Sequence, residues 1–124
     1  MEALILAGTE DTPKIILDKA SNQFEISGRS LPEDVSVFYQ PVLDWLDKYL
    51  ESPLDQMELA FKLEYFNTAS SKLLLDILMK LESVTEKGGN INIKWHYDPK
   101  DTDMQEAGEE YADLVSISFE LVPM

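Results

Sequence analysis

The sequence predicts a two-layer α/β domain in which helices lie mainly on one face of a mixed β-sheet, in the element order βββαβαβαβ. Strand-like and helix-like segments alternate after residue 30, which is typical of parallel crossovers. Two later strand-like segments, 57–66 and 91–98, alternate between apolar and polar residues. A strand covered by helices on both faces would be apolar throughout. One face of the sheet is therefore expected to be at least partly open to water.

The composition limits the possible functions. The length of 124 residues suits a single domain over residues 1–124. The chain has no cysteine, which excludes disulfides and thiolate chemistry and predicts a cytoplasmic location. The formal net charge of -14 argues against nucleic acids and anionic membrane surfaces as partners. The first residues lack the pattern of a signal peptide, and no apolar run approaches the ~20 residues of a membrane span.

The N-terminal part of the chain is predicted to be rich in hairpins. Short apolar segments at 3–7, 14–18 and 24–28 indicate three strands. The segment GTEDTP, residues 8–13, is expected to form a loop because it consists largely of turn residues.

A first helix is predicted over residues 30–53. Its apolar face comprises Phe38, Val42, Trp45 and Tyr49. Ser30 is expected to be the N-cap, and Glu33 three residues later would complete a capping box. Pro41 is expected to kink or split this helix, and Pro53 to end it.

The middle of the chain is predicted to form a strand followed by a second helix. The buried face of the strand is expected to comprise Met57, Leu59, Phe61, Leu63 and Tyr65. The helix begins at about Thr68, and its apolar stripe comprises Leu74, Ile77, Leu78, Leu81 and Thr85. The sequence KGGN, residues 87–90, supplies a glycine for the C-terminal cap.

The C-terminal part is predicted to add a strand, a helix and a final strand. The first of these strands would bury Ile91, Ile93, Trp95 and Tyr97. The helix is expected to have Asp101 as N-cap and to turn inward Met104, Ala107 or Gly108, Tyr111 and Leu114. The final strand would place Ile117, Phe119 and Leu121 on one face.

Signatures of catalysis are scarce. There is neither a glycine-rich phosphate loop nor a GxSxG motif. His96 and Asp98 fall on the polar face of one strand and could form a general base with its orienting carboxylate, but a surface pair near a strand end is favoured. The Asp101 and Asp103 pair lacks the remaining positions of a calcium loop. We expect no enzymatic activity, no metal and no cofactor.

The junction between the middle strand and its helix carries more hydroxyl and amide side chains than one helix cap requires. They are Asn67, Thr68, Ser70 and Ser71. Either Asn67 or Thr68 could cap the helix. A hydroxyl at a helix N-terminus is also a favourable place to carry phosphate, because free backbone N–H groups and the helix dipole stabilise the dianion. The spacing alone leaves both interpretations open.

Four segments in register resemble the SiaC-type regulatory phosphoproteins, a bacterial family whose fold is like that of the STAS domains of anti-sigma-factor antagonists. The segment LEYFNTASSK, residues 63–72, resembles the family's hydroxyl-bearing strand–helix junction. The segments GTEDTPKI (8–15), GRSLPED (28–34) and WHYD (95–98) resemble its other motifs in the same order. The resemblance covers essentially the whole chain and implies a STAS-like fold.

The resemblance implies a role in a partner-switching system. A Ser/Thr kinase of the histidine-kinase-like ATPase type would phosphorylate a threonine in the junction, and a metal-dependent Ser/Thr phosphatase would remove the phosphate. The unmodified form would bind an effector, in described cases a diguanylate cyclase, and so control cyclic-di-GMP signalling. Alignment of the motif assigns the acceptor to Thr68. Ala69 stands where a serine is common, which removes one alternative acceptor.

The resemblance also implies a partner-binding surface around Thr68. This surface would comprise Gly8, Thr9, Thr12, Pro13, Ser30, Pro32, Glu33, Asn67, Ser70 and Ser71. Two other functions stay open. One is an anti-sigma-factor antagonist with the same switch logic, and the other is a small enzyme that uses His96 and Asp98.

Overall fold

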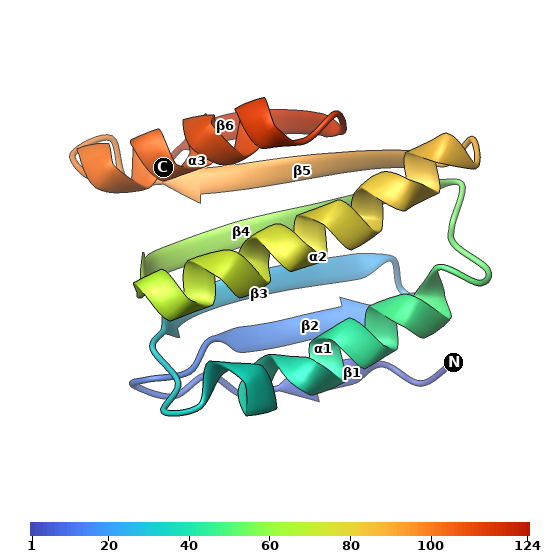
Figure 1. Cartoon of the computed structure of the whole chain (residues 1–124), viewed down its shortest axis with the longest axis horizontal. Helices are drawn as coiled ribbons and strands as arrows, with labels where there is room; N and C mark the ends of the chain where they lie inside the picture. The colour runs from blue at the N-terminus through green and yellow to red at the C-terminus, as the bar shows by residue number, and fades with distance from the viewer.

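The computed structural model describes residues 1–124 and has the predicted order of strands and helices (Figure 1). Its strands are β1 (Leu4–Leu6), β2 (Lys14–Asp18), β3 (Gln23–Ser30), β4 (Gln56–Phe66), β5 (Asn90–Tyr97) and β6 (Ser118–Pro123). Its helices are α1 (Val35–Tyr49), α2 (Thr68–Glu86) and α3 (Thr102–Leu114). None of the helices is both long enough and apolar enough to cross a membrane.

The sheet is mixed, and its strands lie in sequential order from β1 to β6. β1, β2 and β3 pair in antiparallel fashion, whereas β3, β4, β5 and β6 are parallel. Each parallel neighbour is reached through a helix, and all the helices lie on the same side of the sheet (Figure 1). The predicted two-layer α/β architecture is therefore confirmed.

The core lies between the sheet and the helix layer, where 25 buried hydrophobic residues form one cluster. Trp95 of β5 is fully buried there, and its ring contacts those of four neighbours: Phe61, Phe66, Tyr111 and Phe119. Its indole N–H donates to the carbonyl of Met104 at 3.0 Å. Gly108 lets α3 approach closely, because a Cβ at this position would lie 2.5 Å from Trp95 Cδ1.

The face of the sheet without helices is polar, as predicted. Glu25 lies between Lys62 at 3.3 Å and Lys14 at 4.0 Å, and Lys94 pairs with Glu58 at 3.5 Å. Burial alone would raise the pKa of the Glu25 carboxyl. Hydrogen bonds from Ser27 and Lys62, together with the lysine charges, outweigh that effect and hold this pKa below its ordinary value.

The start of α1 differs from the prediction. The helix begins at Val35, and Asp34 is its N-cap, with its carboxylate accepting from the Val37 N–H at 3.1 Å. Ser30 is instead the last residue of β3, so it forms no capping box with Glu33. Strand pairing extends β3 to this point. The Leu31 N–H then donates to the Asp11 carbonyl at 2.8 Å, which keeps the chain out of a helix.

The interior and end of α1 also differ in part from the prediction. The helix runs through Pro41 without being split. It ends at Tyr49, before Pro53, with Leu50 as its C-cap. Tyr39 and Leu46 join the buried face, while Phe38 is only half-buried.

Two residues that were expected in the core face solvent. Leu114 is exposed because it is the last residue of α3. Tyr65 is 47% exposed because the pairing of β3 with β4 shifts: Arg29 pairs with Tyr65, which leaves Glu64 as an extra residue. Such a bulge reverses the alternation of the strand. It turns Tyr65 outward, with the Arg29 guanidinium over its ring, and Phe66 inward against Trp95.

Candidate functional site

Three segments that are distant in the sequence meet at one edge of the sheet. β3 ends at Ser30, β4 ends at Phe66 beside it, and α2 starts two residues later. The Asn67 N–H donates to the Ser30 carbonyl at 3.1 Å, which joins the two strand ends. The loop 8–13 reaches the same edge through the bond from Leu31 to Asp11. The structure thus brings together segments 8–13, 28–34 and 67–71.

Asn67 is the N-cap of α2. Its side-chain Oδ1 accepts from the Ser70 N–H at 2.8 Å, and its carbonyl accepts from the Ser71 N–H at 3.1 Å. Of the two capping candidates, the structure therefore selects Asn67. Thr68 becomes the first helical residue, and its exposed hydroxyl makes no hydrogen bond within the protein.

The first turn of α2 has the features of an anion-binding helix terminus. The backbone N–H groups of Thr68 and Ala69 have no acceptor in the protein, and both residues are exposed. They begin a helix of 19 residues, whose dipole places partial positive charge at this end. A phosphoryl group on the Thr68 hydroxyl would sit where such groups are electrostatically favoured.

The neighbouring hydroxyls are already engaged. Ser70 is 0% exposed, and its hydroxyl donates to the Ser30 carbonyl at 3.0 Å and accepts from Ser30 Oγ at 2.9 Å. The Ser71 hydroxyl donates to the Thr68 carbonyl at 2.6 Å. Among the hydroxyls of this turn, only that of Thr68 is both exposed and unpaired.

The loop 8–13 is held by its own threonines. Thr9 Oγ1 accepts from the Thr12 N–H at 3.0 Å and from the Asp11 N–H at 3.2 Å, and the two threonine hydroxyls are 2.7 Å apart. These short-range bonds give the loop a defined shape, and the bond from Leu31 to Asp11 fixes it beside the end of β3.

The residues predicted to bind a partner fall into three groups according to their solvent exposure. Those exposed, in addition to Thr68, are Gly8, Thr9 and Glu33. Those half-buried are Thr12, Asn67 and Ser71. Those buried are Pro13, Ser30, Pro32 and Ser70. The buried group supports the surface from behind, so its members are not placed to contact a partner directly.

Sequence reasoning missed two tyrosines that hold this junction. The Tyr39 hydroxyl lies 2.6 Å from Ser30 Oγ, and the Tyr111 hydroxyl donates to the Ser71 carbonyl at 2.8 Å. Helical spacing predicted a core position for Tyr111 on α3 but did not include Tyr39 in the apolar face of α1. Nothing in that spacing identifies the polar partner of a buried phenol, because the partner lies on another element.

His96 and Asp98 do not form a catalytic pair. The Asp98 carboxylate accepts from the Lys100 N–H at 2.9 Å, and no hydrogen bond joins it to His96. Burial, and then the charges of Lys62 and Lys94, lower the pKa of His96. A carboxylate partner would act mainly in the opposite direction.

A His96→Ala variant is therefore expected to keep its stability within about 0.5 kcal/mol, as for surface substitutions away from special contacts. Partner binding should also be unchanged. Urea unfolding and a binding titration would check this. A loss of binding with the stability retained would assign His96 a role that its surroundings do not indicate.

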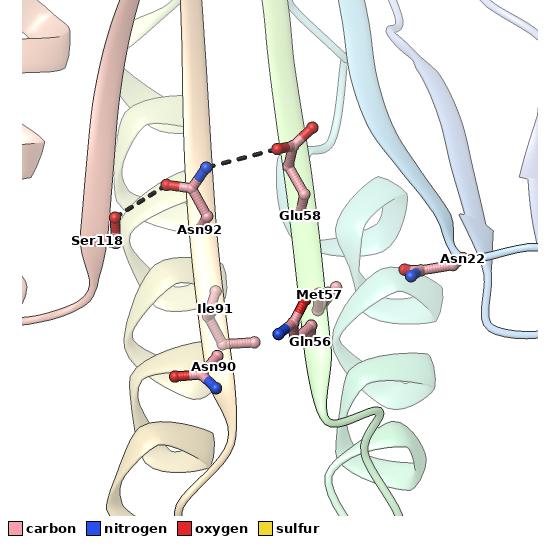
Figure 2. Close-up of a pocket in the computed structure, with 8 residues that line it drawn as sticks. All are labelled: Asn22, Gln56, Met57, Glu58, Asn90, Ile91, Asn92 and Ser118. Atoms are coloured by element: carbon pink, nitrogen blue, oxygen red, sulfur yellow. Dashed lines mark hydrogen bonds between the residues drawn. The ribbon is translucent and has the colours of Figure 1, made fainter.

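A polar hollow lies at the opposite edge of the sheet, where β4 and β5 begin (Figure 2). Its volume is about 460 Å³, and its lining residues are Asn22, Gln56, Met57, Glu58, Asn90, Ile91, Asn92 and Ser118. Ser118 donates to Asn92 at 2.9 Å, and Asn92 donates to Glu58 at 3.5 Å. These two bonds join three of the lining side chains, and the hollow contains no buried side-chain polar atom without a partner, so the start of α2 remains the stronger candidate site.

No cluster of three or more His, Asp or Glu side chains in the chain is placed to hold a metal ion. The functional group that the candidate site presents is the exposed, unpaired hydroxyl of Thr68 at a helix terminus.

Comparison with known proteins gives consistent matches over nearly the whole chain. The model of the SiaC family of regulatory phosphoproteins matches residues 6–124. An uncharacterised protein of Pseudomonas aeruginosa strain UCBPP-PA14 is 33% identical over 119 residues, which is 96% of this chain and 94% of that protein.

Solved structures agree. Apo-SiaC from Pseudomonas aeruginosa has a TM-score of 0.91 and 32% identity, covering 98% of this chain and 99% of that one. A second similar structure is that of the diguanylate cyclase SiaD in complex with its activator SiaC from the same organism. The matching chain of that complex has a TM-score of 0.90 and 31% identity to this protein, and the match covers 98% of this chain and 99% of the other.

Proposed function

The chain belongs to the SiaC family of regulatory phosphoproteins, and from this premise we propose that it is a switch protein reversibly phosphorylated on Thr68. The observation that carries the proposal is the contrast between hydroxyls at the start of α2. The Thr68 hydroxyl is exposed and unpaired, whereas those of Ser70 and Ser71 are engaged in hydrogen bonds. In this proposal the chain is a substrate and a ligand, and it is not an enzyme.

A Ser/Thr kinase of the histidine-kinase-like ATPase type would supply the phosphoryl group from ATP. The Thr68 hydroxyl oxygen forms a bond to the γ-phosphorus, the bond to the ADP leaving group breaks, and the hydroxyl proton is released. The modified side chain carries about -1.5 to -2 charges. The unpaired N–H groups of Thr68 and Ala69 would accommodate them. A metal-dependent Ser/Thr phosphatase would hydrolyse the ester and restore the hydroxyl.

The unmodified form is proposed to bind a diguanylate cyclase. Pseudomonas aeruginosa SiaC is described as the activator of the cyclase SiaD, with which it forms a complex, and it is 31% identical to this chain. The proposed contact surface includes Thr68 and the exposed residues Gly8, Thr9 and Glu33. A phosphate dianion buried in such an interface would be costly through desolvation and charge repulsion. An anti-sigma-factor antagonist would use the same switch logic, but the SiaC–SiaD complex favours the cyclase.

Mass spectrometry tests the acceptor directly. The protein is incubated with ATP, magnesium and the histidine-kinase-like kinase from its own organism, and then its intact mass and fragments are measured. We expect one phosphate, located on Thr68, and none on a Thr68→Ala variant. A Ser71→Ala variant removes the neighbouring hydroxyl and should still carry its single phosphate on Thr68. No phosphate, or phosphate spread over other hydroxyls, would contradict the proposal.

A further inference from the structure

Three buried hydroxyls from three different elements form a chain beneath the start of α2. Ser30 ends β3, Tyr39 lies on α1 and Ser70 lies on α2, and all three are 0% exposed. Buried hydroxyls are costly unless they are hydrogen-bonded. No buried side-chain polar atom in the protein lacks a partner, so this chain of hydroxyls is fully satisfied.

The geometry shows which hydroxyl is the donor in each of these hydrogen bonds. The Ser70 hydroxyl donates to the Ser30 carbonyl, and the Ser30 hydroxyl donates to Ser70 Oγ. Each hydroxyl has a single proton to donate. In the 2.6 Å hydrogen bond between the Tyr39 hydroxyl and Ser30 Oγ, Tyr39 must then be the donor. Burial raises the pKa of Tyr39 to about 12, so this donor stays protonated at physiological pH.

A second tyrosine holds the same turn from the other side. Tyr111 of α3 donates to the Ser71 carbonyl at 2.8 Å, and its ring packs against Trp95 and Phe66. Burial raises the pKa of Tyr111, and the nearby Tyr39 phenol contributes to this shift. The acceptor turn, residues 67–71, is therefore held by Tyr111 directly and by Tyr39 through Ser30. The two tyrosines belong to α3 and α1, the helices on either side of α2 (Figure 1).

We propose that Tyr39 and Tyr111 are positioning residues that hold the acceptor turn in the one shape from which Thr68 is phosphorylated. The inference rests on the proposed function and extends it to the way the kinase recognises its substrate. Thr68 is presented as the first residue of an anchored helix, not as part of an extended segment. The kinase would then recognise the folded surface, and the phenols would fix its shape without touching the kinase.

We call the support of the acceptor turn by the Tyr39 and Tyr111 hydroxyls the clamp. Hydrogen exchange tests this clamp without any kinase. The reporters are the amides of Ser70 and Ser71, both of which are bonded to Asn67. Tyr39→Phe and Tyr111→Phe should each accelerate exchange at these amides by about fivefold relative to amides in the centre of β4, as for the loss of one typical hydrogen bond. Tyr49→Phe is the matched control. Tyr49 is also a fully buried tyrosine on α1, but its hydroxyl accepts from the Leu54 N–H at the far end of the helix.

Phosphorylation kinetics test the consequence. With the same kinase and full-length protein, kcat/KM for Thr68 should fall at least about fivefold in both clamp variants and stay unchanged in Tyr49→Phe. Binding of the kinase to a loosened turn should be weakened, so the change should appear mainly in KM. A synthetic peptide of residues 63–78 should be phosphorylated far more slowly than the folded chain.

The outcomes separate the two proposals. If the wild type takes no phosphate on Thr68, the proposed function fails and this inference fails with it. If the wild type is phosphorylated but the clamp variants behave like Tyr49→Phe in both measurements, only the clamp is overturned. Phosphorylation of the peptide at the rate of the folded chain would overturn it as well.

Discussion

Replacing Thr68 by glutamate is expected to weaken binding of the proposed cyclase partner at least about tenfold, or by about 1.4 kcal/mol. Thr68 lies among the exposed residues at the junction of segments 8–13, 28–34 and 67–71. In the proposed complex, a carboxylate at this position would have to lose its water when the partner docks against a surface that otherwise meets a neutral hydroxyl. The desolvation cost therefore falls on the complex and not on the free protein.

The same substitution is expected to stabilise the free protein by about 0.3–1 kcal/mol. A negative side chain in the first turn of α2 interacts favourably with the helix dipole, and α2 has no acidic residue there. Opposite effects on folding and on binding would therefore identify a charge switch. A destabilised fold would reduce both.

Isothermal titration with the purified cyclase and thermal unfolding of the free protein would measure the two effects. Thr68→Gln is the matched control, because it has nearly the same shape as glutamate but no charge. It should bind close to the wild type and should not gain stability. Equal losses of binding for glutamate and glutamine would show that size, not charge, controls the interface.

A Trp95→Ala variant is expected to lose about 3–5 kcal/mol of stability, enough to unfold a marginal domain. Trp95 is fully buried, and its ring contacts four other aromatic rings. Its removal leaves a large cavity between β5 and α3, and it also leaves the Met104 carbonyl without its indole donor. The free energy of unfolding in urea, measured by circular dichroism, would test this.

Trp95→Phe separates the two contributions. Phenylalanine keeps much of the buried ring but cannot donate to Met104, so its cost should be clearly smaller than that of alanine. Tyr111 packs on the Trp95 ring and reaches Ser71, so Trp95→Ala should also loosen the acceptor turn. A loss below about 2 kcal/mol for Trp95→Ala would mean that the core closes around the gap.

Local signals predicted the element order and the open face well. The alternation of β4 from Met57 to Leu63 and the apolar stripe of α2 reflect repeats of the backbone, so they are visible in the chain itself. The failures lie where one element constrains another. Tyr65 follows a bulge that only the pairing of β3 with β4 reveals, and Ser30 belongs to β3 because a neighbouring strand extends it.

The candidate site follows the same division. The family motif assigned the proposed acceptor role to Thr68, and the surplus of hydroxyls in the junction pointed to the same region. The sequence could not assign a role to each hydroxyl, because it does not show whether the hydroxyls of Thr68, Ser70 and Ser71 are exposed or engaged in hydrogen bonds. Their partners, Ser30 and the Thr68 carbonyl, become apparent only when β3 and α2 are in place.

By itself, then, the sequence determined the α/β class and the acidic surface, because these depend on composition and on short-range periodicity. Its motifs, in register along the chain, identified the family to which the chain belongs. Only the tertiary structure decided which hydroxyl is free, which residues of the junction are buried, and that Tyr39 and Tyr111 support it. The physical reason is that a hydrogen bond between residues 40 positions apart leaves no periodic trace in the chain.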